Sequence, residues 1–409
     1  MSKHIKFVQF PEAQNETGSP DSEAWHSWRA SGIGASDALH IAADAGLLVN
    51  KPSFANGRKL MAQKLGLAAP VETNAAMQRG KDFEPLARKD VEERLSTAVL
   101  PKFGESLHWP WMKASFDGLT FDGKIIEIKV PRTQDAAVHQ AAKEGEVIEY
   151  YRPQLAQQMM VLHGDPAKWH GDEQVLFFSY HPESGELAQA VMTGEELRPL
   201  ASELLEAERE FVHRWEALYS SADDIREQME DLEREHGQLM REYAELDAIA
   251  KTAKDYIRLA VEEDGYAPER FTVSQRKRRQ TKLDQAALRE TCGWVRDKDI
   301  PDQYRKPDIT IVRLFKPEVT FSTPEEAEKA YLKADAALKQ IKDRYDEVKK
   351  AISSIVEPVG YFESDLFTVF RRSGGVDWKK VAVDLGIDLD QFTSIEEVSY
   401  TVLSKKRTA

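Results

Sequence analysis

The sequence predicts a mixed α/β fold for the first 220 residues, followed by a helical extension with two small duplicated α+β modules. Three observations lead to this prediction. Short apolar runs with period-2 alternation lie between residues 109 and 192, next to amphipathic helical segments. Beyond Ser221, apolar residues recur every seven positions, as in paired helices. Two stretches of the extension then resemble each other at a separation of about 95 residues.

Composition narrows the class of protein. A chain of 409 residues is long enough for two or more domains. Cys292 is the single cysteine, which excludes an intramolecular disulfide framework and suits a reducing cytoplasm. No apolar run reaches membrane-spanning length, and the N-terminus lacks a signal-peptide pattern. We therefore expect a cytoplasmic protein that has no membrane partner.

The net charge of −14 is the main argument against DNA binding. Affinity for a duplex depends on the neutralisation of phosphates by Lys and Arg. The acidic excess is spread over both halves of the chain, and an acidic average still permits a local basic channel.

Strands are predicted at about 109–115, 124–130, 174–180 and 186–192. In the second of these, Glu127 and Lys129 alternate with isoleucines, so both point to one face of the strand. Asp122-Gly123 is a hairpin signal that folds this strand back on the one before it. Asp117 is then expected at the end of the first strand, close to Glu127.

Two carboxylates and a lysine on one small surface suit phosphodiester hydrolysis. Asp117 and Glu127 can hold a hard divalent cation, which polarises a phosphate and lowers the pKa of a bound water. Lys129 can orient that water or offset charge on the transition state. The same residues are equally common as a loop carboxylate and a solvated Glu-x-Lys ion pair, so both interpretations are open at this point.

A helix is predicted from Arg79 to Leu95, with Glu84 at helical spacing from Ala87 and Val91. A glutamate on the apolar face of a helix needs a cation or hydrogen bonds to compensate it. Alternatively, Glu84 lies at the edge of that face, in the first turn, where it favours the helix dipole.

Residues 28–37 place two glycines and Ser36 before an Ala-rich helix. Glycines permit close backbone approach, the amides of a helix start attract phosphate, and Arg29 can add a fork of donors. Taken alone, this segment is better explained as an ordinary loop with a good helix cap.

A third helix begins near Tyr150, with Pro153 in its first turn. Gln154, Gln157 and Gln158 follow on this helix. Their amides can touch a metal-bound water or DNA, or merely coat the helix.

The motifs have a characteristic order: Arg-x-x-Gly-Ile-Gly-Ala-Ser, Arg-Gly-x-x-x-Glu-Pro, Ser-Phe-Asp-Gly, Glu-Ile-Lys-x-Pro and a Tyr/Gln-rich helix. This order resembles the lambda exonuclease and YqaJ-type viral recombinase family of the PD-(D/E)XK nuclease superfamily, over about residues 20 to 200. The family helix usually reads Gln-x-Gln. Here Gln154-Leu155-Ala156 lacks the second glutamine, and Gln157 or Gln158 is the alternative.

The resemblance implies roles for particular residues. Asp117 and Glu127, with the carbonyl of Ile128, would bind Mg²⁺ or Mn²⁺. Lys129 would be the catalytic lysine, Glu84 would complete the acidic cluster, and Gln154 would join the site. The resemblance also associates Arg29 and Ser36 with the 5′-phosphate of a DNA end.

The function implied is a metal-dependent exonuclease of phage-type recombination, from a phage or prophage in a bacterial host. Its substrate would be linear double-stranded DNA, degraded from 5′ to 3′ to expose a 3′ single strand for a single-strand annealing protein. Members of this family resemble closed trimeric rings, which implies a homo-oligomer.

Two rival functions are compatible with the same residues. One is a catalytically idle DNA-binding or scaffold protein on a nuclease fold. The intact Asp117, Glu127 and Lys129 argue against it, because a scaffold has no reason to keep clustered carboxylates. The other is an endonuclease or single-strand nuclease of the same superfamily.

The extension divides into two similar units, each headed by a long helix. Ile225, Leu232 and Leu239 start a heptad seam that continues to Ala260, and a second helix is expected from Glu325 to Val356. The seam favours a short antiparallel pairing and a long dimeric coiled coil equally. We expect domains at 1–220, 221–315 and 316–409.

The first of these units contains a basic cluster within a predicted strand, Arg276-Lys277-Arg278-Arg279. Such a cluster can contact the DNA backbone. It can also be a solvated edge strand whose charges prevent aggregation. We favour contact with DNA or a partner.

Overall fold

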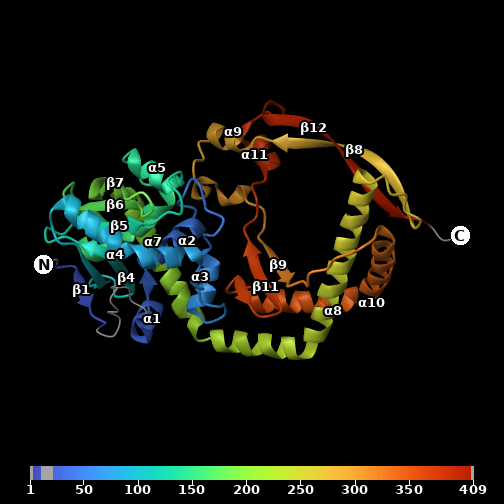
Figure 1. Cartoon of the computed structure of the whole chain (residues 1–409), viewed down its shortest axis with the longest axis horizontal. Coiled ribbons are helices and arrows are strands. Elements are labelled where there is room, and N and C mark those ends of the chain that lie inside the picture. The colour runs from blue at the N-terminus through green and yellow to red at the C-terminus, as the bar shows by residue number, and fades with distance from the viewer. Residues whose placement is uncertain (1–2, 11–21, 407–409) are drawn as a thin grey trace. The chain divides into compact units, whose positions relative to one another are not determined.

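The computed structural model describes residues 3–10 and 22–406 and divides into two compact units (Figure 1). The first unit comprises Met1–Lys64, Pro70–Ala217 and Arg296–Lys298, and the second comprises Leu65–Ala69, Leu218–Val295 and Asp299–Ala409. Within the described ranges, no helix combines the length and the apolar character needed to cross a membrane.

The first unit is built on a seven-stranded sheet of order β1-β3-β4-β5-β6-β7, in which β2 also pairs with β4. Strands β5 and β6 are parallel, and the other neighbours along this order are antiparallel. The strands are β1 (Ile5–Val8), β2 (Ile33–Gly34), β3 (Leu100–Ser106), β4 (Met112–Leu119), β5 (Ile125–Lys129), β6 (Gln174–His181) and β7 (Glu186–Thr193).

The four predicted strands correspond to β4, β5, β6 and β7, which confirms the mixed α/β class of this half. Strand β4 begins three residues later than predicted. The reason is a turn, in which the Met112 N–H donates to the carbonyl of Trp109 at 2.8 Å.

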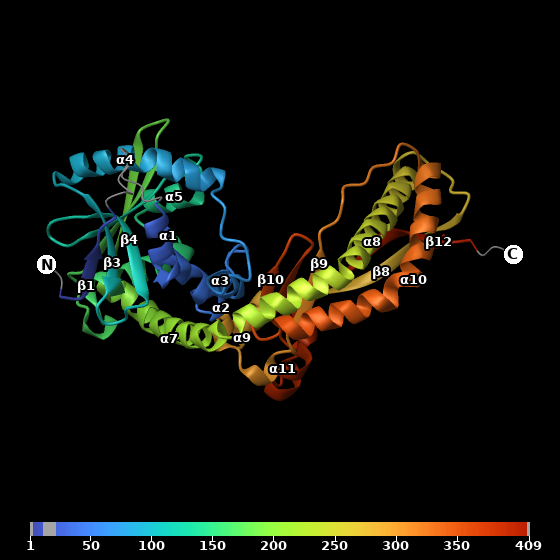
Figure 2. The same ribbon diagram turned by 90° about the horizontal axis from the view of Figure 1, so that it is seen from below.

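Helices cover both faces of this sheet (Figure 2). They are α1 (Glu23–Ala30), α2 (Ala38–Asp44), α3 (Gly57–Lys64), α4 (Ala75–Leu95), α5 (Ala137–Lys143), α6 (Arg152–His163) and α7 (Gly194–Tyr219). On one face, Ala87 and Val91 of α4 pack against Ile126, Ile128 and Phe178.

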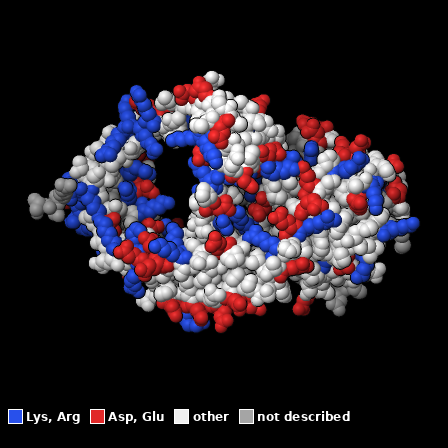
Figure 3. Space-filling model, turned by 180° about the vertical axis from the view of Figure 1, so that it is seen from behind, with Lys and Arg blue, Asp and Glu red and all other residues white. Residues whose placement is uncertain are grey.

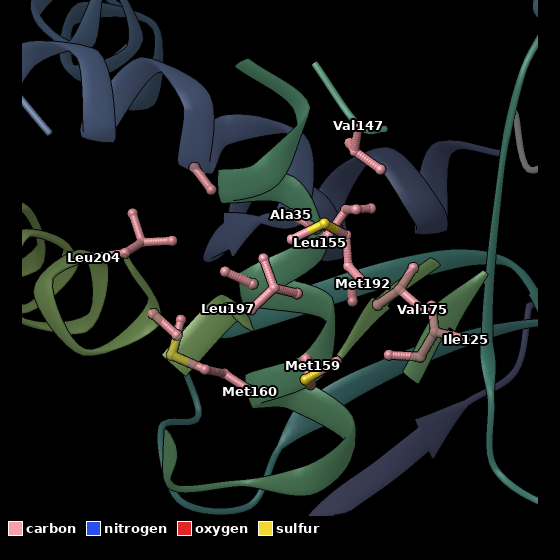
Figure 4. Close-up of a cluster of buried hydrophobic side chains, with 14 of the residues drawn as sticks. Ala35, Ile125, Val147, Leu155, Met159, Met160, Val175, Met192, Leu197 and Leu204 are labelled. Carbon is pink, nitrogen blue, oxygen red and sulfur yellow. The ribbon is translucent and has the colours of Figure 1, made fainter. Parts of the chain in front are cut away.

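On the other face, the main core joins α2, α6 and α7 to the sheet (Figure 4). Leu155 and Met159 of α6 are fully buried there beside Ile125, and Leu197 of α7 is buried in the same cluster. Ile125 therefore packs on the face opposite to Ile126 and Ile128. This is the alternation that the sequence pattern of β5 predicts.

Helix α7 begins with a capping box. The Thr193 hydroxyl accepts a hydrogen bond from the Glu196 N–H at 3.3 Å, and the Glu196 carboxylate accepts one from the Thr193 N–H at 2.8 Å.

The second unit contains two long helices, α8 (Ala222–Glu263) and α10 (Pro324–Val356), which lie side by side (Figure 2). The rings of Tyr243 and Tyr345 stack with their centroids 3.7 Å apart, and Ile257 packs in one cluster with Ala327. Later residues of α8 thus contact earlier residues of α10, so the helices are antiparallel. The later part of the heptad seam of α8 is covered by the chain's own second helix.

Each long helix of the second unit is followed by strands and a short helix. The remaining elements are β8 (Phe271–Leu283), α9 (Gln285–Thr291), β9 (Ile309–Leu314), β10 (Tyr361–Glu363), β11 (Phe367–Arg372), α11 (Trp378–Leu385) and β12 (Thr393–Lys405).

The two similar sequence units, 221–315 and 316–409, exchange their strands. Strand β8 of the first sequence unit begins with Phe271-Thr272-Val273, and its counterpart β11 in the second begins with Phe367-Thr368-Val369. Each of these strands pairs antiparallel with the last strand of the other sequence unit, so β8 pairs with β12 and β11 pairs with β9. Asp284 caps α9, and its N–H donates to the carbonyl of Phe392; Asp377 caps α11, and its N–H donates to the carbonyl of Tyr304. The predicted boundary at residue 315 therefore does not separate two modules, because each half completes the sheet of the other.

A carboxylate is buried in α7 without a visible partner. Glu208 has no exposed surface, and neither of its carboxylate oxygens has a hydrogen-bond partner within the described ranges. Burial, and secondarily the nearby Asp37, hold the pKa of Glu208 well above its usual range. The protonated form is therefore the one that suits the folded state.

Replacing Glu208 by Gln should raise the free energy of unfolding by an amount that grows with pH. The folded-state pKa of Glu208 lies above the unfolded one, so its contribution is intact below the unfolded pKa and is lost as pH rises toward the folded pKa. The advantage of the variant should grow by about 1.4 kcal/mol per pH unit above roughly pH 4.3. Urea unfolding of both proteins at several pH values measures it. Glu210→Gln, at an exposed position of α7, is the control, and the same pH trend in both variants would contradict this account.

Candidate active site

The hairpin between β4 and β5 sets the spacing of the site. Gly118 pairs with Ile126 and Leu119 with Ile125, after which the strands are joined by a tight turn. Gly123 has a φ of 85°, which glycine adopts without strain. The Thr120 hydroxyl donates to the Asp122 carboxylate at 2.5 Å and closes the turn. Continuing this register by one residue sets Asp117 level with Glu127.

Asp117 is half-buried near the end of β4. Its Oδ2 accepts a hydrogen bond from the Ile128 N–H at 2.7 Å. Burial, together with the negative charges of Glu127 and Glu84, holds the pKa of Asp117 well above its usual range. One backbone hydrogen bond and the nearby Lys129 do not offset these effects. Asp117 is thus an undercompensated carboxyl group that gains from a cation.

Glu127 is only 1 % exposed and is surrounded by donors. Lys129 Nζ pairs with its Oε1, and the Gln154 amide donates to the same oxygen at 2.6 Å. The Gln158 amide donates to Oε2 at 2.6 Å. Because burying an unpaired carboxylate is costly, these three donors allow Glu127 to lie inside the sheet.

Lys129 retains some exposure, with 23 % of its side chain accessible. Its ammonium group lies 5.0 Å from the centre of the Tyr151 ring, a cation–π distance. Burial alone would lower the pKa of Lys129, but the charges of Glu127 and Asp117 outweigh it and raise the pKa. Lys129 is therefore a fixed positive charge beside the two carboxylates.

Glu84 of α4 belongs to the same electrostatic cluster. Its carboxylate pairs with Arg88 one turn later, and burial raises the pKa of Glu84 despite that partner. Arg88 also donates to the carbonyl of Asp117 at 2.8 Å and so links α4 to β4. We did not single out Arg88 from the sequence, although its i+4 spacing from Glu84 is a signal for this pair.

The structure distinguishes the three glutamines of α6. Gln154 and Gln158, one helical turn apart, both donate to Glu127. Gln157 points elsewhere and donates to the backbone carbonyls of Ile33 and Lys113. The second glutamine that contacts the acidic cluster is thus Gln158, at i+4 rather than i+2.

Asp117 and Glu127 suit a hard cation better than a soft one. Both supply carboxylate oxygens, and the family resemblance adds the carbonyl oxygen of Ile128 as a third donor. No group of three or more His, Cys, Asp or Glu side chains in the described ranges is arranged to hold a metal ion. Mg²⁺ needs no such group, since it commonly keeps several waters and takes one or two carboxylates. The donor set therefore fits Mg²⁺.

Arg29 and Ser36 meet at the start of the α2 segment. The Arg29 guanidinium donates to the Ser36 hydroxyl, and it lies 5.2 Å from the centre of the Trp25 ring. Behind them, Asp37 is paired with Lys64 at 2.9 Å and accepts the Gly34 N–H at 3.0 Å. The predicted pair is thus brought together on a braced loop, although this geometry alone does not define a phosphate site.

The basic cluster Arg276-Lys277-Arg278-Arg279 lies on β8 in the second unit.

The residues grouped by the structure around Glu127 are Glu84, Asp117, Lys129, Gln154 and Gln158, with Arg88 and Tyr151 as further neighbours.

Comparison with known proteins agrees with the order of the sequence motifs. Residues 24–165 match the family model of the YqaJ-like viral recombinase domain. No curated protein sequence matches the chain. The chain carries a YqaJ-like viral recombinase domain, which confirms the predicted family.

Solved structures with a similar region include an alkaline exonuclease from Laribacter hongkongensis, at 24 % identity and a TM-score of 0.40 over 50 % of this chain and 97 % of that one. The same enzyme in complex with dAMP has 22 % identity and a TM-score of 0.39, over 53 % of this chain and 100 % of that one. A phage-related exonuclease from Haemophilus somnus has 14 % identity and a TM-score of 0.31, over 46 % of this chain and 96 % of that one. The family and the carboxylate–lysine cluster together indicate a nuclease that acts on DNA.

Replacing Asp117 by Asn should separate stability from cation binding. The variant removes a buried negative charge, so its melting temperature without metal should be at or above that of the wild type. Mg²⁺ at a hundredfold excess over its dissociation constant should stabilise the wild type by about 2.7 kcal/mol and the variant far less. Thermal unfolding with Mg²⁺ and with chelator measures both effects. Asp135→Asn, at an exposed position, should respond to Mg²⁺ like the wild type, and an equal response of Asp117→Asn would remove Asp117 from the metal site.

Proposed function

We propose that this chain is a metal-dependent deoxyribonuclease that degrades linear double-stranded DNA from the 5′ end and exposes a 3′ single strand. The observation that carries the proposal is the juxtaposition of Asp117 and Glu127, on adjacent strands, with the ammonium group of Lys129. Clustered carboxylates of this kind destabilise a fold unless a cation or a reaction needs them.

The residues would divide the work of hydrolysis. Asp117, Glu127 and the carbonyl of Ile128 would hold Mg²⁺, or Mn²⁺, which when bound supplies an acidified water and polarises the phosphate. Lys129, kept charged by its neighbours, offsets negative charge that develops on the phosphate. Gln154 and Gln158 hold the Glu127 carboxylate in one orientation, and Glu84 with Arg88 supports the backbone of Asp117.

Action at an end, rather than within a strand, is the part of the proposal that rests on Arg29 and Ser36. A guanidinium held beside a hydroxyl at the start of a helical segment offers convergent donors to a terminal phosphate. By family resemblance we also propose a homo-oligomer, of which a trimer is the expected form, and a single-strand annealing protein as partner.

The proposed activity is tested by replacing Glu127 with Gln, which keeps the shape and removes the charge. Loss of one preorganised electrostatic group typically costs about 100-fold or more in rate. We therefore expect at least that loss in release of nucleotides from linear duplex DNA with Mg²⁺, and no cleavage with chelator. Glu93→Gln, on the exposed face of α4, should digest at the wild-type rate.

Substrates labelled at the 5′ or the 3′ end, beside closed circular DNA, report the mode of action. Release of the 5′ label first, with the circle intact, supports the proposal. Cleavage of the circle would make the chain an endonuclease, and wild-type activity of Glu127→Gln would overturn the assignment of the site.

Replacing Arg29 by Ala should selectively impair digestion of 5′-phosphorylated ends. A charged hydrogen-bond donor removed from a phosphate costs about tenfold in affinity, whereas a 5′-hydroxyl end has no charge to lose. The ratio of kcat/KM for phosphorylated and hydroxyl ends measures the effect. Arg94→Ala, on an exposed part of α4, is the control. Equal losses on both kinds of end would assign Arg29 a structural role.

A further inference from the structure

The pair of strands β8 and β12 forms a long ribbon that is covered only at its ends. The strands pair over thirteen residues each, from Phe271 opposite Lys405 to Leu283 opposite Thr393. Phe271 packs against the α8–α10 pair, and Leu283 packs with the core around α9 and α11. Between these anchors, residues 275–282 and 394–400 are exposed.

A bare two-stranded ribbon is marginally stable in water, because neither face is buried. This one nevertheless leaves Ile395 69 %, Val398 38 % and Tyr400 42 % exposed along its middle. The cost of such a surface suggests that the ribbon has a ligand.

The charge of the ribbon is opposite to that of the chain. Its two strands carry six Lys and Arg against two Glu, in a protein with a net charge of −14. Lys and Arg gather over this ribbon in the space-filling view (Figure 3). Charge complementarity therefore points to a polyanion.

Strand alternation divides the basic run into two unlike faces. Lys277 and Arg279 lie an even number of residues from the anchoring residues Phe271 and Leu283, so they are on the same face of the strand. On this face, Glu397 pairs with Lys277 at 2.8 Å. Arg276 and Arg278 lie on the opposite face, which is directed away from the cores at both ends. No ion pair of these two arginines is found among the described residues.

The outward face also carries an aromatic ring. Tyr400 lies directly opposite Arg276 in the register, and Val398 lies opposite Arg278, so all four side chains stand on one face. Two guanidinium groups that form no ion pair within the described part of the chain thus lie on the same face as an exposed ring. Farther along this face, Lys282 pairs with Glu396 and contributes less free charge.

The duplication within the second unit provides an internal comparison. The equivalent strand β11 is only six residues long, and a third strand, β10, pairs along it. Phe367 and Val369 of β11 are fully buried, and Arg371 is neutralised by Asp308 at 3.3 Å. The exposed basic stretch is therefore found in the β8–β12 pair and has no counterpart in the β11–β9 pair of the other copy.

We infer that the outward face of the β8–β12 ribbon is a binding site for single-stranded DNA. Arg276 and Arg278 bind consecutive backbone phosphates, and Tyr400 stacks on an unpaired base. A positively charged track beside an aromatic platform is the combination that binds single strands without regard to sequence. The inference rests on the proposed nuclease function for the identity of the ligand as DNA, and it adds a site for the single strand that the nuclease exposes.

The test measures the binding of a fluorescein-labelled oligodeoxythymidine to the full-length chain by anisotropy in chelator, where no cleavage occurs. Arg276→Ala/Arg278→Ala should weaken binding at least about tenfold in moderate salt and reduce the slope of log affinity against log salt by about 1.4. Tyr400→Ala should weaken binding about tenfold while leaving that slope unchanged.

The matched control is Lys277→Ala/Arg279→Ala, which removes the same charge from the same strand on the other face. The fall in the logarithm of the affinity for this control should be less than half of the fall for Arg276→Ala/Arg278→Ala. Similar losses in both double variants would overturn the inference, since they would indicate a diffuse charge effect. Wild-type binding by Arg276→Ala/Arg278→Ala would overturn the inference too. So would a greater loss of affinity, in that variant, for a blunt duplex of equal length than for the oligodeoxythymidine.

The readout is independent of the proposed function. Glu127→Gln should lower the cleavage rate about 100-fold or more and should leave binding by the ribbon unchanged, so a failed nuclease proposal and a failed ribbon site give different results. Circular dichroism of each variant checks that its overall secondary structure is retained.

Discussion

The buried carboxylate of Glu127 is the constraint on which the N-terminal unit depends. At 1 % exposure it tolerates its charge only because Lys129, Gln154 and Gln158 surround it. Two of these donors, Gln154 and Gln158, come from α6. The residues that follow them, Leu155 and Met159, are fully buried in the main core. The packing of α6 on the sheet and the compensation of Glu127 are therefore one requirement. Loss of either weakens both.

Asp117 is compensated far less than its neighbour. It accepts one backbone hydrogen bond, and burial with two adjacent carboxylates raises its pKa. The proposed metal site accounts for this imbalance, because a bound cation would satisfy the negative charge that the protein's own donors leave uncompensated. Arg88 links the two acidic residues by binding the backbone carbonyl of Asp117 and the carboxylate of Glu84.

The strands and acidic residues were predictable from the sequence because their signals are local. Period-2 alternation marked β5, and Asp122-Gly123 marked the turn that brings Asp117 level with Glu127. The choice between Gln157 and Gln158 was not predictable, since it depends on how α6 rotates against β4 and β5. Nor was the strand exchange in the extension. The similarity of residues 221–315 and 316–409 indicates a duplication, but no local pattern states which β-strands pair across it.

The strand exchange explains how a duplicated segment acquires a new surface without losing its fold. Strand β8 pairs with β12 and strand β11 pairs with β9, so two separate strand pairings join the two copies. The short copy, backed by β10, has buried residues in its strands and supplies stability. The long copy is anchored by Phe271 and Leu283 and needs no core between them. Its middle is therefore free to vary, and basic and aromatic residues are tolerated there that a buried strand would exclude.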